Sequence, residues 1–135
     1  MTTGYSGRPL AAKLGLADSM DAVSLGAPDR YPKLLGDSAS AIRPVDALSG
    51  SPGFIHVFVT LRAELEALLE AGLRHMRRDG MIWVSWPKKS SGLKSEITED
   101  TIREIALPLG LVDVKVCAVD ETWSGLKLVI RKAIR

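Results

Sequence analysis

The chain has 135 residues, of which 46% are apolar, 25% are charged and 5% are aromatic. This length suits one domain, and the composition excludes a fibrous, low-complexity or disordered protein. The 18 basic and 16 acidic residues are interleaved and leave a net charge of only +2, so charge gives weak support for nucleic acid. We expect a single domain over residues 1–135 and do not expect a nucleic-acid partner.

Cysteine content and hydropathy indicate the cellular compartment in which the protein is expected. Cys117 is the only cysteine, so no intrachain disulfide or cysteine-rich metal site can form. No stretch approaches the roughly 20 apolar residues of a membrane helix, and residues 1–16 lack the apolar core of a signal peptide. We therefore expect a cytoplasmic protein without a membrane partner.

Basic residues are densest in two short groups. Such groups are common on solvated surfaces, and we expect these to serve solubility. The groups are Arg74, Arg77 and Arg78 and, near the C-terminus, Arg131, Lys132 and Arg135.

The N-terminal part predicts a lead-in helix within residues 1–16, with Ser6 as its cap, Pro9 in its first turn and Gly15 at its end. A short buried strand follows at residues 22–25 and runs into a turn. Residues 31–35 predict a brief helix and residues 42–48 a weaker strand.

The central part predicts two strands and two helices. Residues 54–59 and 81–86 are nearly continuous in apolar residues, as in strands covered on both faces of a parallel sheet. Thr60 can cap a helix that Gly80 stops. Thr98 can cap another. Pro87 directs the chain into a polar loop over residues 88–95, and Pro108 and Gly110 close the last helix.

The C-terminal part predicts an antiparallel hairpin, because residues 111–119 and 126–131 are β-rich and only residues 120–125 separate them. The preceding alternation of strands and helices indicates parallel strands joined by right-handed crossovers. We therefore expect an α/β domain of three layers, whose sheet is mostly parallel and ends in this hairpin.

If the strands are parallel, their carboxyl ends share one edge of the sheet, and ligands of open α/β sheets bind outside that edge. Small, charged and aromatic residues follow the predicted strands there. Two lysines could neutralise a phosphate or a carboxylate, or could be merely solvated. The candidate ligand-binding residues are Gly26, Asp46, Trp86, Lys88, Lys89, Asp120, Glu121 and Trp123.

Several candidates have structural alternatives. Asp120 and Glu121 could act as bases, but pairing with the lysines is the simpler interpretation. Trp86 and Trp123 could form a stacking wall for a planar ligand, anchor a partner chain, or pack within loops. Trp83 is expected in the core.

No catalytic or metal-binding residue stands out. His56 lies inside a predicted strand and His75 near a helix end, without further ligands at metal-site spacing. Cys117 reads as a small buried residue. The segment 90–92 lacks the pattern of a phosphate-binding loop or a nucleophile elbow.

Three sequence blocks are distinctive: GYSG at residues 4–7, WVSWPKK at residues 83–89 and VDETWSGLK at residues 119–127. With them the chain resembles, over essentially its whole length, a small bacterial family of uncharacterised proteins. That resemblance implies no activity, because none is assigned to the family.

The strand-type segment at residues 79–85, the helix after it and the closing hairpin resemble the C-terminal half of class I methyltransferases, which have a Rossmann-like fold. Those enzymes hold S-adenosylmethionine with a glycine-rich turn after the first strand and an acid at the end of the second. Here Gly26 stands alone, Pro28 lacks an amide donor, and Asp46 is a weak match for the acid.

The sequence identifies no cofactor and no reaction. Our first hypothesis is a non-catalytic Rossmann-like domain that binds a small anionic or nucleotide-like ligand, or a protein, at the carboxyl edge. The alternatives are a reduced S-adenosylmethionine-dependent methyltransferase and a homo-oligomeric interaction module.

Overall fold

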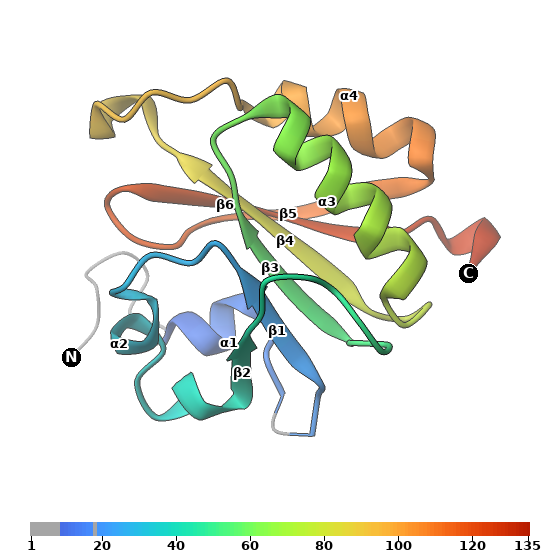
Figure 1. Cartoon of the computed structure of the whole chain (residues 1–135), viewed down its shortest axis with the longest axis horizontal. Helices are drawn as coiled ribbons and strands as arrows, with labels where there is room; N and C mark the ends of the chain where they lie inside the picture. Colours follow the sequence, from blue (N-terminus) through green and yellow to red (C-terminus); the bar gives the residue numbers. More distant parts are fainter. Residues whose placement is uncertain (1–8, 18) are drawn as a thin grey trace.

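The computed structural model describes residues 9–17 and 19–135, which form a six-stranded sheet with helices on both faces (Figure 1). The strand order is β2-β1-β3-β4-β6-β5. The strands are β1 (Ala22–Leu25), β2 (Ile42–Pro44), β3 (Phe54–Phe58), β4 (Met81–Pro87), β5 (Leu111–Ala118) and β6 (Trp123–Ile130).

The first five strands run in one direction. β1 pairs in parallel with β2 and β3, and β3 pairs in parallel with β4. β6 is antiparallel to both β4 and β5, so β5 runs the same way as β1 to β4. This confirms the predicted mostly parallel sheet with its C-terminal antiparallel hairpin.

Two helices cover each face of the sheet and complete three layers (Figure 1). On one face the core includes Leu14 and Leu35, and on the other it includes Leu69 and Ile102. The first face carries α1 (Leu10–Leu14) and α2 (Tyr31–Leu35), and the second carries α3 (Arg62–His75) and α4 (Glu99–Leu109). The described residues also form the 3₁₀ turns η1 (Gly36–Ala41), η2 (Lys89–Ser91) and η3 (Lys132–Ile134).

The predicted helix ends are partly confirmed. Gly15 ends α1 in a left-handed conformation, whereas the proposed cap Ser6 lies outside the described residues. Thr60 does not cap α3: the helix begins two residues later, and the Thr60 amide donates to Glu64 Oε1 at 3.3 Å. Pro108 lies inside α4, and Gly110 alone ends it.

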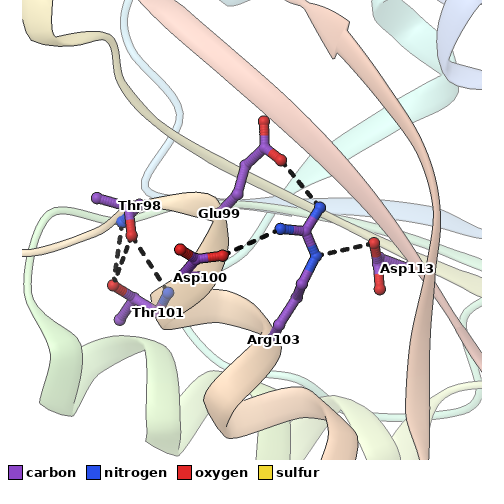
Figure 2. Close-up of polar contacts among 6 residues, drawn as sticks. All are labelled: Thr98, Glu99, Asp100, Thr101, Arg103 and Asp113. Carbon is purple, nitrogen blue, oxygen red and sulfur yellow. Dashed lines mark hydrogen bonds and ion pairs between the residues drawn. The ribbon is translucent and has the colours of Figure 1, made fainter.

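The N-terminus of α4 has the predicted cap and is tied to the sheet (Figure 2). Thr98 Oγ1 accepts a hydrogen bond from the Thr101 amide at 3.3 Å. The Arg103 guanidinium lies 2.9 Å from Glu99 and 3.0 Å from Asp113 of β5. These contacts fix α4 over the hairpin.

Three strand boundaries differ from the prediction. β2 ends at Pro44 rather than near residue 48, and Pro87 is the last residue of β4. β6 begins at Trp123, because the Val119 amide donates to the Trp123 carbonyl at 2.9 Å and closes a turn shorter than predicted. β2 and β5 are the edges of the sheet, and β5 has a register irregularity between Asp113 and Lys115.

A polar row lies buried on the α2 face. His56 of β3 is fully buried, and its Nδ1 lies 2.6 Å from the Tyr31 hydroxyl while its Nε2 lies 2.7 Å from Ser85 Oγ. A neutral imidazole donates at one nitrogen and accepts at the other, so both contacts are satisfied without charge. Burial lowers the pKa of His56 to about 3 and raises that of Tyr31.

The buried imidazole predicts a loss of stability in acid. Between the unfolded pKa of 6.5 and the folded pKa of about 3, only the unfolded chain binds the His56 proton. The free energy of unfolding therefore falls with decreasing pH in this window, by up to about 1.4 kcal/mol per pH unit from this group. Urea unfolding at several pH values measures the slope.

The contribution of His56 is isolated by comparing variants. We expect His56→Gln to reduce the pH slope, whatever its effect on stability at pH 7. His75→Gln is the matched control, because it also removes a histidine but one that is half-buried and lies outside this polar row, and His56→Gln should change the slope more. Equal slopes in all three proteins would contradict the assignment.

Candidate functional site

A pocket of about 310 Å³ opens at the carboxyl ends of β1, β2 and β3. Because β1 lies between β2 and β3, the connection from β1 leads to β2 on one side of it, and the next connection leads to β3 on its other side. Open α/β sheets bind ligands at such a switch point. The pocket is lined by Leu25, Gly26, Val45, Asp46, Phe58, Glu64, Ala67 and Leu68.

Gly26 permits the close approach of β1 and β3 at this point. Its φ is +71°, a region that other residues rarely adopt. A Cβ atom there would lie only 2.9 Å from the Phe58 carbonyl oxygen. The turn after β1 therefore requires glycine for two independent reasons.

The pocket is acidic and otherwise apolar. Asp46 follows β2 and is exposed at the rim, and Glu64 projects from the first turn of α3. Among residues 9–17 and 19–135, no lysine or arginine lines the pocket. Such a site can accept hydrogen bonds from hydroxyl or ammonium groups, and it disfavours phosphate.

The turn between β5 and β6 is organised by Asp120, whose side chain is 3% exposed. Its Oδ1 accepts hydrogen bonds from the amides of Thr122 at 2.8 Å and Trp123 at 2.7 Å. Its main-chain oxygen accepts one from Lys88 Nζ at 2.9 Å. Asp120 is thus a structural residue of the hairpin turn.

Arg30 joins this turn to the loop after β1. Its Nε lies 3.3 Å from Asp120 Oδ2, and its Nη2 lies 3.2 Å from Glu121 Oε1. Asp120 Oδ2 is buried and accepts no hydrogen bond from the described residues, so the ion pair with Arg30 is its polar contact among them. The sequence favoured pairing of Asp120 and Glu121 with the lysines, and no local pattern points to Arg30 as their partner.

Trp86 lies near the end of β4 and Trp123 begins the neighbouring β6, but their side chains occupy opposite faces of the sheet. Trp86 is 7% exposed in the core beneath α3 and α4. Trp123 is half-buried on the α1 and α2 face, with its ring 5.2 Å from that of Phe58 in an edge-to-face contact. They do not form a common stacking wall.

The candidate residues therefore fall into separate groups. Gly26 and Asp46 share the pocket with Phe58 and Glu64, which were not among the candidates predicted from the sequence. Lys88, Asp120, Glu121 and Trp123 lie at the hairpin turn, Trp86 is core, and Lys89 is exposed at the start of η2. The predicted strand directions correctly placed these residues at the carboxyl edge of the sheet. They did not show that the residues form separate groups along that edge.

Metal binding, membrane insertion and thiol chemistry find little support in residues 9–17 and 19–135. No three potential ligands among them lie together in a way that could hold a metal ion. None of their helices has both the length and the apolar character needed to span a bilayer. Cys117 is half-buried, and desolvation raises the pKa of its thiol.

Gly26→Ala should be more destabilising than Gly50→Ala, its matched control. Gly50 has a similar φ of +66°, but a Cβ there would meet nothing within 4 Å. The control carries only the left-handed cost of about 1–2 kcal/mol. The contact with Phe58 should add at least about 1 kcal/mol at Gly26. Urea unfolding measures both, and equal losses would refute the close approach.

Asp120→Ala should lower the free energy of unfolding by about 1–3 kcal/mol, because it leaves two amide donors without their acceptor. Glu121→Ala removes a carboxylate that is 75% exposed and should change it by less than about 0.5 kcal/mol. Chemical denaturation compares the two. A larger loss for Glu121→Ala would contradict the structural role of Asp120.

Solved methyltransferase structures have a similar fold. Ribosomal protein L11 methylase from Lactobacillus delbrueckii subsp. bulgaricus has 14% identity and a TM-score of 0.53, over 91% of this chain and 64% of that one. The CcbJ methyltransferase from Streptomyces caelestis has 8% identity and a TM-score of 0.56, over 90% and 87%.

A third example is an O-methyltransferase from neocarzinostatin biosynthesis, in complex with S-adenosyl-L-homocysteine and 1,4-dihydroxy-2-naphthoic acid. It has 14% identity and a TM-score of 0.53, over 68% of this chain and 35% of that one. The chain thus spans less than two thirds of the length of this enzyme and of the L11 methylase. At these identities the likeness shows the fold alone.

Sequence comparison identifies the family. No curated protein matches the chain. Residues 61–132, more than half of the chain, match the family described as "Protein of unknown function (DUF3052)". The chain therefore belongs to the DUF3052 family, and its fold is that of the class I methyltransferases.

Proposed function

We propose that this protein binds a nucleoside-like ligand in the pocket at the carboxyl ends of β1, β2 and β3. The observation that carries the proposal is that Gly26 and Asp46, from the ends of two neighbouring strands, line one pocket. Its volume of about 310 Å³ lies at the lower end of the range for small-molecule sites.

The walls of the pocket suit a base and a sugar. Leu25, Val45, Phe58 and Leu68 supply apolar surface for a planar ring. The Asp46 carboxylate can accept hydrogen bonds from a pair of vicinal hydroxyls, the role that an acid at the end of the second strand has in dinucleotide-binding folds. Asp46 was thus a candidate from the sequence, and its position in the pocket supports vicinal hydroxyls as its proposed partner.

The carboxylates at the pocket and at the hairpin turn limit the charge of the ligand that can bind. A small anionic ligand was among the expectations, but Asp46 and Glu64 would repel one from this pocket. At the hairpin turn, Arg30 already pairs with Asp120 and Glu121, so a phosphate there would compete with two carboxylates. A neutral or cationic nucleoside derivative fits better than a nucleotide.

A reduced S-adenosylmethionine-dependent methyltransferase is a second candidate. The similar fold of an enzyme solved with S-adenosyl-L-homocysteine favours it. So do the two carboxylates, which would attract the sulfonium and ammonium groups of S-adenosylmethionine. This candidate differs from the first in requiring transfer of the methyl group.

Calorimetric titration with adenosine and with S-adenosylmethionine tests the proposal. We expect binding of at least one of them, weakened about tenfold or more by Asp46→Asn, because one charged acceptor is lost, about 1.5 kcal/mol or more. Asp37→Asn is the matched control: Asp37 is exposed in η1, does not line the pocket, and should leave the affinity unchanged.

The outcomes separate the two candidates. Binding of adenosine alone supports a nucleoside-binding domain. Tighter binding of S-adenosylmethionine, lost in Asp46→Asn and in Glu64→Gln, supports the methyltransferase. No heat with either compound at millimolar concentration, or equal losses in Asp46→Asn and Asp37→Asn, would overturn the proposed site.

A further inference from the structure

The two basic groups of the sequence come together in the fold. One spans the last turn of α3 and the residues after it, and the other follows β6. Both lie at the amino edge of the sheet, opposite the pocket. Arg78 Nη2 donates to the Ile134 main-chain oxygen at 2.8 Å and joins the two segments. The resulting basic patch consists of Arg74, Arg77, Arg78, Arg131, Lys132 and Arg135.

Main-chain contacts hold the C-terminal segment in place. The Arg131 amide donates to the Gly110 carbonyl at 2.7 Å, and Arg135 Nε donates to the Ile130 carbonyl at 2.9 Å. The basic side chains are therefore presented from a turn packed on the body of the domain. Less conformational entropy is lost on binding than for a free basic tail.

Most of the charge in the patch is available. All six basic side chains are exposed. Two acids lie beside Arg77: Asp79 is engaged by Arg77 itself at 3.0 and 3.1 Å, and Asp21 is paired with Arg43 at 2.6 Å. Within residues 9–17 and 19–135, the side chains of Arg74, Arg131 and Lys132 form no hydrogen bond or ion pair. The patch thus retains a concentrated positive charge that the net charge of +2 conceals.

We propose that the basic patch binds the phosphate backbone of a nucleic acid. Five of its six cations are arginines, whose guanidinium groups match phosphate geometry with paired hydrogen bonds. Every described aromatic side chain is buried or half-buried, so none is available there for stacking on bases. Contacts to phosphates alone give binding without sequence preference.

An anionic membrane fits the patch less well. Interfacial binding combines cations with an apolar surface that enters the lipid, and Ile134, 44% exposed, is the only exposed large apolar side chain in the two basic segments. The nucleic acid would lie at the opposite edge of the sheet from the pocket. A nucleoside bound there would therefore be a separate ligand, and neither proposal depends on the other.

Fluorescence anisotropy with a labelled DNA duplex of random sequence tests the proposal. The affinity of the wild-type protein should fall linearly with salt on a logarithmic scale between about 50 and 200 mM. The double variant Arg74→Gln/Arg131→Gln removes one cation from each segment. Neither of these two side chains forms a hydrogen bond or ion pair with the described residues, so the change breaks no polar contact among them. It should weaken binding about tenfold and lower the salt slope by about two.

Lys33→Gln/Lys94→Gln is the matched control. It removes the same charge from two exposed lysines outside the patch and should change the affinity less than about twofold. Circular dichroism of each variant checks folding. No binding at about 50 mM salt, or an equal loss in the control, would overturn the proposal. So would binding to phosphatidylglycerol vesicles without binding to the duplex, which would indicate a membrane surface instead.

Discussion

The arrangement of the whole site depends on the pairing of β1, a strand of four residues, with β2 on one side and β3 on the other. This pairing brings the ends of three parallel strands into register. The turn after β1 can follow only because Gly26 lets it pass against the Phe58 carbonyl. Without this close approach of the turn to β3, Asp46 after β2 and Glu64 in the first turn of α3 would not line the same pocket.

A second constraint connects the two ends of the chain. Arg30, which follows β1, reaches the turn between β5 and β6 and contacts Asp120 there. Asp120 is already saturated at Oδ1 by two amides, so its position is set by the turn and not by the arginine. The hairpin therefore acts as a fixed support for the loop that borders the pocket.

The sequence predicted the sheet well because its signals are local. Continuous apolar runs identified β3 and β4, Gly15 and Gly110 marked helix ends, and the short interval after Val119 predicted a hairpin. Boundaries that depend on tertiary pairing were missed. Trp123 belongs to β6 because of its pairing with β4, and no local pattern reveals this.

The site was less predictable than the fold. Strand direction placed Gly26 and Asp46 at one edge, but periodicity did not reveal which face each side chain takes, so Trp86 and Trp123 were wrongly grouped. Glu64 and Ala67 line the pocket only because α3 packs beside it. Likewise, the two basic groups are 53 residues apart at their nearest members, Arg78 and Arg131, and only the folded chain makes them one surface.

The two outer strands also bear on self-association. β2 has only three residues and ends in Pro44, which has no amide to donate, and the ladder of β5 is interrupted between Asp113 and Lys115. Short, proline-containing or bulged borders are poor templates for continuing a sheet into a neighbouring molecule. Any homo-oligomer of this protein would therefore be expected to join through side-chain surfaces, and the folded domain should resist the strand-by-strand growth that leads to fibrils.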